Sequence, residues 1–154
     1  MVSGYAALAA GLFGTDTILK KTVEERLEPG EERKLFHGRI LLRRVYNYGV
    51  MLNILSDHPK IIRSASLLLG AGMLIFDMIV WPLWGRHVQK LGLSLFTGGA
   101  LSNIFDRLIR GRVVDYFGIQ TRWKKFTDVT FNLGDLFIFA GALLVSVFPG
   151  FWKK

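Results

Sequence analysis

The sequence predicts an α-helical membrane protein with four transmembrane helices and a small β-layer at the membrane surface, folded as one domain over residues 1–154. Hydrophobic residues make up 51% of the 154-residue chain, and the mean hydropathy of +0.33 is high for a soluble domain. The apolar residues gather into four runs near the length of about 20 residues that crosses a bilayer. The charged residues lie mostly in the connectors between these runs.

The first apolar run, residues 2–19, is rich in Ala and Gly. It does not combine a charged start with an Ala-x-Ala-like cleavage site, so we interpret it as a transmembrane span and not as a removable signal peptide. Small residues recur in it four positions apart, a spacing that lets helices approach closely in lipid. The other three predicted spans are residues 61–84, 88–105 and 129–152.

Two polar connectors separate the spans. The first, residues 21–60, opens with a charged stretch that we expect to form a solvated turn or a short helix. Its later part, residues 39–51, mixes β-branched, aromatic and basic residues, which indicates a strand lying at the membrane surface. The second connector, residues 110–128, contains a strand-like segment at residues 113–117.

Composition excludes several kinds of chemistry. The chain has no cysteine, which excludes disulfides, zinc–thiolate sites and a cysteine nucleophile. Its three histidines are scattered without a metal-ligand spacing, so we expect no metal and no cofactor. The net charge of +8 suits either nucleic acid or an anionic membrane surface. No nucleic-acid-binding motif accompanies the charge, so we expect membrane phospholipid as a partner and no nucleic acid.

Two aspartates next to the last two spans point to catalysis. Ionisable groups in such places are costly and usually functional. Asp115 follows the third span after a short connector, and Asp135 lies in the first turns of the fourth. If these spans are antiparallel, both carboxylates meet at one membrane face, and one of them holds a proton because two close carboxylates do not both ionise easily. Such a pair supplies the base and the acid of an aspartic protease.

Other polar groups leave alternatives open. Asp106 and Arg107 are adjacent and therefore point to different sides of a helix. Arg107 could pair with Asp16 or Asp135, or could hold a lipid phosphate by a bidentate contact, with Asp106 as its counter-ion. From spacing alone, such paired groups also fit structural contacts in a helical bundle or a transport relay.

Two further residues have a less specific interpretation. Asp77 lies inside the second span, and we expect it to face the bundle interior, with a proton-relay role as the alternative. A serine protease centred on Ser102 is disfavoured, because no histidine or lysine lies nearby in sequence at a spacing that would activate the hydroxyl.

The polar segments in the last third of the chain match a known set of motifs. Residues 98–107 read GGALSNIFDR, residues 111–116 read GRVVDY and residues 131–135 read FNLGD. In order and spacing they resemble the GGAxxNxxDR, VVDF or VVDY, and FNxxD motifs of the lipoprotein signal peptidases (signal peptidase II). Weaker resemblances precede them: residues 16–20 resemble the DQxxK motif, and residues 46–49 resemble the YNxG motif. The resemblance covers about residues 16–142.

The resemblance implies a function and a location. Signal peptidase II is a membrane aspartic endopeptidase that cleaves the signal peptide of a diacylglyceryl-modified prolipoprotein before the lipidated cysteine. It is a multi-pass enzyme of the bacterial cytoplasmic (inner) membrane, with its β-layer and active site at the outer face, and needs no metal or cofactor. By resemblance, Asp115 and Asp135 are catalytic, the partner is a lipidated prolipoprotein, and we expect a monomer. The residues implied to support the pair or the substrate are Asp16, Lys20, Asn47, Gly49, Asn103, Asp106, Arg107 and Asn132.

Some neighbours of the motifs depart from the family pattern. Thr17 stands where Gln is usual, residues 50–52 replace Ala-Ala-Phe, Gly134 replaces Ala, and Leu136 replaces Ser. The first two departures bear on substrate fit, and the last could change the hydrogen bonding of the aspartate pair. The changes at Met51, Gly134 and Leu136 motivate an alternative: a catalytically altered paralogue that binds lipidated peptides or a membrane partner without cleaving.

The basic residues conflict with the orientation that the family implies. Ten of the 20 Lys and Arg residues lie in residues 20–63 and six in residues 107–125. Because basic connectors usually face the cytoplasm, this distribution alone would place both connectors inside. The family topology places them outside, and we expect that orientation because the lipidated substrate is cleaved at the outer face. A small transporter that uses Asp77 and Asp135 as a relay is a further alternative.

Overall fold

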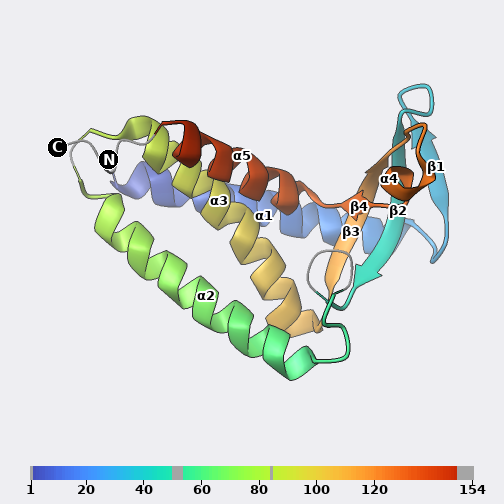
Figure 1. Ribbon diagram of the computed structural model, residues 1–154, viewed down its shortest axis with the longest axis horizontal. Coiled ribbons are helices and arrows are strands. Elements are labelled where there is room, and N and C mark those ends of the chain that lie inside the picture. Colours follow the sequence, from blue (N-terminus) through green and yellow to red (C-terminus); the bar gives the residue numbers. More distant parts are fainter. Residues whose placement is uncertain (1, 50–53, 84, 149–154) are drawn as a thin grey trace.

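Four long helices and one small sheet make up the fold. The computed structural model describes residues 2–49, 54–83 and 85–148. Figure 1 shows the helices as an elongated bundle with the sheet at one end. The long helices are α1 (Val2–Arg26), α2 (Pro59–Val80), α3 (His87–Phe105) and α5 (Leu133–Val147). A π-helical turn, η2 (Asp106–Arg110), continues α3, and the short helix α4 (Lys124–Thr127) lies beside the sheet.

The helices agree with the four predicted apolar runs in number and place, but not in every boundary. The first run was predicted to end at residue 19, whereas α1 continues to Arg26 through part of the charged stretch. Helix α5 begins at Leu133, later than the predicted start at residue 129. Residues 84 and 149–152, at the predicted ends of two spans, lie outside the described residues. Within the described parts, two helices, α1 and α2, are long and apolar enough to cross a membrane.

Glycines let three of the helices pack backbone against backbone. A Cβ atom added at Gly98 of α3 would lie 2.8 Å from the carbonyl oxygen of Ala9 in α1. One added at Gly92 would lie 3.0 Å from the carbonyl oxygen of Gly141 in α5. Such close approach is what small residues permit between helices in lipid. Helix α3 therefore packs closely against both α1 and α5.

The sheet is antiparallel, in the order β1–β2–β3–β4. Its strands are β1 (Glu32–Leu35), β2 (Ile40–Asn47), β3 (Val113–Ile119) and β4 (Thr130–Phe131). The strands predicted within residues 39–51 and at residues 113–117 correspond to β2 and β3. The extension of α1 supports the sheet, since Val23 and Leu27 pack in one buried cluster with Tyr116 of β3.

Candidate active site

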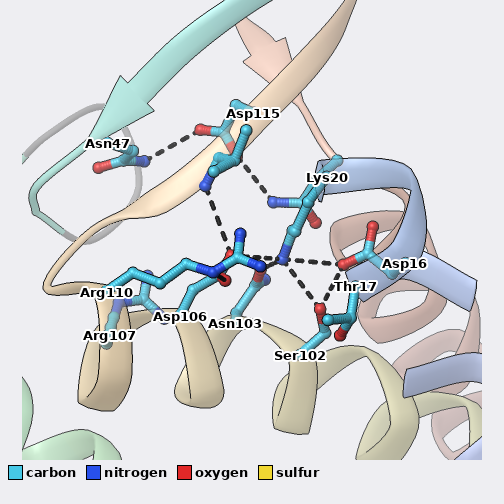
Figure 2. Close-up of polar contacts among 12 residues, drawn as sticks. Asp16, Thr17, Lys20, Asn47, Ser102, Asn103, Asp106, Arg107, Arg110 and Asp115 are labelled. Carbon is cyan, nitrogen blue, oxygen red and sulfur yellow. Dashed lines mark hydrogen bonds and ion pairs between the residues drawn. The ribbon is translucent and has the colours of Figure 1, made fainter. Parts of the chain in front are cut away.

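Asp115 is held where strand β3 faces the ends of the helices. Gly111, with a φ of 72°, ends η2 and turns the chain into β3. The Asp115 side chain is buried, and its two oxygens accept hydrogen bonds from two different amides. Asn132 Nδ2 donates to Oδ1 at 2.7 Å. Asn47 Nδ2, from the end of β2, donates to Oδ2 at 3.3 Å, and Figure 2 shows this second contact. Both oxygens are therefore fixed in direction.

Asp135 is positioned by the start of helix α5. Asn132 is the N-cap residue, and its side-chain oxygen accepts from the Asp135 backbone N–H at 2.9 Å. In return, Asp135 Oδ2 accepts from the Asn132 backbone N–H at 3.1 Å, which completes a capping box. The other carboxylate oxygen accepts from Asn103 Nδ2 of α3 at 2.9 Å. The sequence FNLGD thus forms a local structure that orients its own aspartate.

The two carboxylates converge on one residue. Asn132 is fully buried; its amide nitrogen holds Asp115, and its amide oxygen and backbone hold Asp135. Burial and the nearby negative charge of Asp135 together raise the pKa of Asp115 to about 6, against the opposing effect of the two amide donors. The structure therefore brings together the two aspartates that the sequence singled out.

A fully buried lysine supports this arrangement from α1. Lys20 Nζ lies 2.8 Å from Asp16 and 3.0 Å from Asp106 (Figure 2). The same ammonium donates to Asn103 Oδ1 at 2.8 Å and to Ser102 Oγ at 3.0 Å. Since Lys20 accepts no hydrogen bond, the Asn103 oxygen must face it, and the Asn103 NH₂ must then face Asp135. Lys20 thus selects the amide orientation that Asp135 needs.

Asp106 and Arg107 do not form the pair that the sequence suggested. The Asp106 carboxylate forms its close ion pairs with Lys20 and, at 3.4 Å, with Arg110, while Arg107 interacts with it only through longer-range electrostatics. Lys20, and not Arg107, pairs with Asp16. The Arg107 guanidinium lies near enough to both site aspartates to interact electrostatically with them. It also donates to the carbonyl oxygen of Gly49 at 3.5 Å.

Sequence reasoning missed the role of Tyr116. Its hydroxyl donates to Asp16 Oδ1 at 3.0 Å and accepts from the Leu133 backbone N–H, in the first turn of α5, at 2.9 Å. The Tyr116 side chain therefore connects three elements. It joins strand β3, which carries Asp115, to helix α5, which carries Asp135, and both of them to α1. The sequence did contain a signal for this role: a tyrosine directly follows Asp115 in a predicted strand. Buried tyrosines usually form a hydrogen bond through the hydroxyl, so a polar partner for Tyr116 could have been expected.

Replacing Tyr116 by Phe removes the hydroxyl and keeps the aromatic ring, so the variant tests the two hydrogen bonds alone. We expect Tyr116→Phe to lower the free energy of unfolding by about 2 kcal/mol, because a buried carboxylate oxygen and a backbone N–H both lose a partner. Thermal unfolding of the purified protein measures the change. Tyr46→Phe is the matched control: the Tyr46 ring packs 3.8 Å from the Arg112 guanidinium, and its hydroxyl has no hydrogen bond among the described residues. Equal unfolding temperatures for the two variants would contradict the role of Tyr116.

The departures from the family pattern do not break these contacts. A Cβ atom at Gly134 would lie 2.8 Å from Asp16 Oδ2 and 3.0 Å from the Gly99 carbonyl oxygen, so glycine fits the close packing of α3 and α5 here. Leu136 is 45% exposed and is not among the partners of the two site carboxylates. Thr17 bonds back to the Phe13 carbonyl of its own helix. Residues 50–52 lie outside the described part of the chain.

The other polar candidates lie in separate contacts. Asp77 is fully buried in α2, as expected for a residue facing the bundle interior, and accepts a 2.6 Å hydrogen bond from Thr97 of α3. Ser102 is engaged by Asp16 and Lys20, so its hydroxyl is a structural donor and acceptor. Among the described residues, no group of three His, Asp or Glu side chains could hold a metal ion.

A buried carboxylate, Asp115, and a partly buried one, Asp135, held by amide donors around one asparagine form the kind of site that the class of aspartic peptidases uses. The comparison with protein families narrows the class. The signal peptidase (SPase) II family matches residues 8–149, so the chain belongs to the signal peptidase II family of aspartic endopeptidases.

Individual relatives agree with this assignment. The chain is 32% identical over 143 residues to a lipoprotein signal peptidase of Mesorhizobium japonicum, a match that covers 93% of this chain and 83% of the relative. It is 29% identical over 134 residues to that of Wigglesworthia glossinidia brevipalpis, covering 87% and 86%. A solved bacterial membrane enzyme superposes with a TM-score of 0.83 over 100% of this chain and 94% of that one, at 18% identity. This structural similarity shows that the two proteins share a fold.

Proposed function

We propose that this chain is a membrane endopeptidase that removes the signal peptide from diacylglyceryl-modified prolipoproteins, cutting before the lipidated cysteine. Family membership and the names of its relatives support the substrate class. The observation that carries the proposal is the convergence of Asp115 and Asp135 on Asn132. Both aspartates come from one chain, so a monomer is sufficient for the reaction.

The proposed mechanism uses one shared proton. In the reactive state one carboxyl of the pair is protonated and the other is ionised, and the two titrate as a unit. The ionised carboxylate accepts a proton from a water molecule, whose oxygen attacks the carbonyl carbon of the scissile peptide bond. The protonated carboxyl donates its proton to the carbonyl oxygen. The C–N bond then breaks as a proton passes to the leaving amine, and the pair returns to its starting state.

We further propose that four helices span the bacterial inner membrane, with the sheet and the site at its outer face. The length and apolar character of α1 and α2 support this placement. A groove of about 270 Å³ beside α3 and η2 has an almost purely apolar lining and suits an acyl chain of the substrate. Its lining residues are Phe13, Leu101, Ile104, Phe105, Leu108 and Ile109. The lipidated substrate would reach the site sideways from the bilayer.

A cleavage assay tests the proposed function. The protein, purified and placed in lipid nanodiscs, is incubated with a prolipoprotein that carries the diacylglyceryl group and with the same polypeptide lacking it. We expect release of the signal peptide from the lipidated form alone. Binding of the lipidated form with no turnover over many hours would reject the peptidase and favour the non-cleaving paralogue.

A further inference from the structure

A second cavity lies between the start of α2 and the turn η2, where these two segments approach each other in Figure 1. Its volume is about 360 Å³. None of the described residues that line it is acidic, and four of them are basic. The lining residues are Tyr48, Pro59, Lys60, Ile62, Arg63, Arg107, Leu108, Ile109, Arg110 and Gly111.

The four basic residues form two facing pairs. Lys60 and Arg63 are three positions apart at the start of α2, and Arg107 and Arg110 are three positions apart in η2. Arg110 is matched by Glu24 at 3.0 Å and by Asp106. Lys60 and Arg63 are exposed and form no ion pair within the described residues. The cavity therefore carries unbalanced positive charge on its α2 side.

The first turn of α2 adds to this charge. Pro59 occupies the beginning of the helix, and the preceding His58 provides no side-chain cap for the first backbone N–H groups. The N-terminus of a helix carries a partial positive charge that favours anions. Backbone and side chains at the start of α2 thus favour an anion in the same cavity.

The flanks of the cavity are apolar. Ile61 is 58% exposed and Ile109 is 70% exposed, each next to a basic residue that lines the cavity. Helix α2, which begins here, is long and apolar enough to cross a bilayer, so its first turn lies at the depth of the lipid headgroups if it spans the membrane. A small soluble anion needs no apolar flank, whereas a phospholipid presents a phosphate and acyl chains together.

We infer that this cavity binds the phosphate group of an anionic phospholipid, with Lys60 and Arg63 as its main ligands and Arg107 at its inner wall. The inference rests on the membrane placement proposed above but not on peptide cleavage. A bound headgroup would sit beside the guanidinium that faces the two site aspartates. An anionic lipid would therefore contact the residues next to the aspartate pair, in addition to forming part of the bilayer around the protein.

Lipid binding without substrate tests the inference. The purified protein in detergent is titrated with phosphatidylglycerol, and retained lipid is counted by native mass spectrometry. We expect the double variant Lys60→Gln/Arg63→Gln to bind roughly tenfold more weakly than the unchanged protein, as two lost contacts to an anionic headgroup imply. Lys124→Gln/Lys125→Gln is the matched control, since it removes the same charge from exposed positions of α4. We expect less than about a twofold change there.

Three results would overturn the inference. Equal affinity of the Lys60/Arg63 variant and the unchanged protein would show that the cavity does not select the lipid. Equal losses in both double variants would show attraction by net charge alone. Retention of inorganic phosphate but not of phosphatidylglycerol, lost in the Lys60/Arg63 variant, would identify a soluble anion as the ligand. A failed cleavage assay with selective lipid binding intact would reject the peptidase and leave this site standing.

Discussion

Asp115→Asn and Asp135→Asn each lower the kcat for prolipoprotein cleavage by roughly 10³-fold or more. An amide accepts no proton from water at these positions and donates none as an acid, so either change removes one half of the pair. Each variant keeps one side-chain oxygen as an acceptor and places an NH₂ group opposite the other donor, so each loses one of its two hydrogen bonds. Single-turnover cleavage of a lipidated substrate, with insertion into the membrane checked separately, measures the loss.

The matched control is Asp128→Asn. Asp128 is an exposed carboxylate that follows α4, and its replacement makes the same change in charge and shape away from the pair. Its cleavage rate should stay within about twofold of the unchanged protein. Near-normal cleavage by either Asp115→Asn or Asp135→Asn, in a correctly inserted protein, would reject the two-aspartate mechanism.

Lys20→Met has the largest expected effect on stability, a loss of about 3–5 kcal/mol in the free energy of unfolding. Lys20, Asp16 and Asp106 are all fully buried, so removing the ammonium leaves two carboxylates without their shared cation. Cleavage should fall as well, since Asn103 is no longer forced to turn its NH₂ toward Asp135. Thermal unfolding and the cleavage assay together measure both effects.

The adjacent lysine provides the control. Lys21 has a side chain that is 70% exposed and lies 3.7 Å from Glu25, whose side chain is 61% exposed. Exposed ion pairs of this kind contribute little, so Lys21→Met should change the free energy of unfolding by no more than about 0.5 kcal/mol. Lys20→Arg adds a variant that keeps the charge but not the shape. If Lys20→Met is as stable as Lys21→Met, the buried ion cluster does not hold the site together.

The aspartate pair could be predicted because Asp115 lies in the connector before the fourth apolar run, Asp135 lies near the start of that run, and both lie in motifs that resemble signal peptidase II. The capping box around Asp135 is likewise local, since its partner Asn132 is three residues away. Strands β2 and β3 could be predicted from their β-branched residues. Strand β1 could not: all four of its residues are exposed, so it has no alternation of burial, and it exists through backbone pairing with β2.

Contacts between distant parts of the chain could not be predicted from spacing. Lys20 lies 82 residues from Ser102 and 83 from Asn103 in sequence, so only the packing of α1 against α3 brings them together. For the same reason the sequence left the partner of Arg107 open among Asp16, Asp135 and a lipid phosphate. Lys60 ends the predicted first connector and Arg63 begins the predicted second span, and nothing in their spacing indicates that they face Arg107 and Arg110 of η2.

The central claim is that Asp115 and Asp135 act as one coupled acid pair. Carbon NMR of the Asp115 carboxyl group, followed through a pH titration, tests it directly. In the unchanged protein we expect a pKa near 6, so that the carboxyl is protonated below this pH and ionised above it. In Asp135→Asn the neighbouring negative charge is gone, and the pKa should fall, while burial keeps it above the ordinary value of 3.8. An unchanged pKa in that variant would show that the two carboxylates do not interact and would contradict the account.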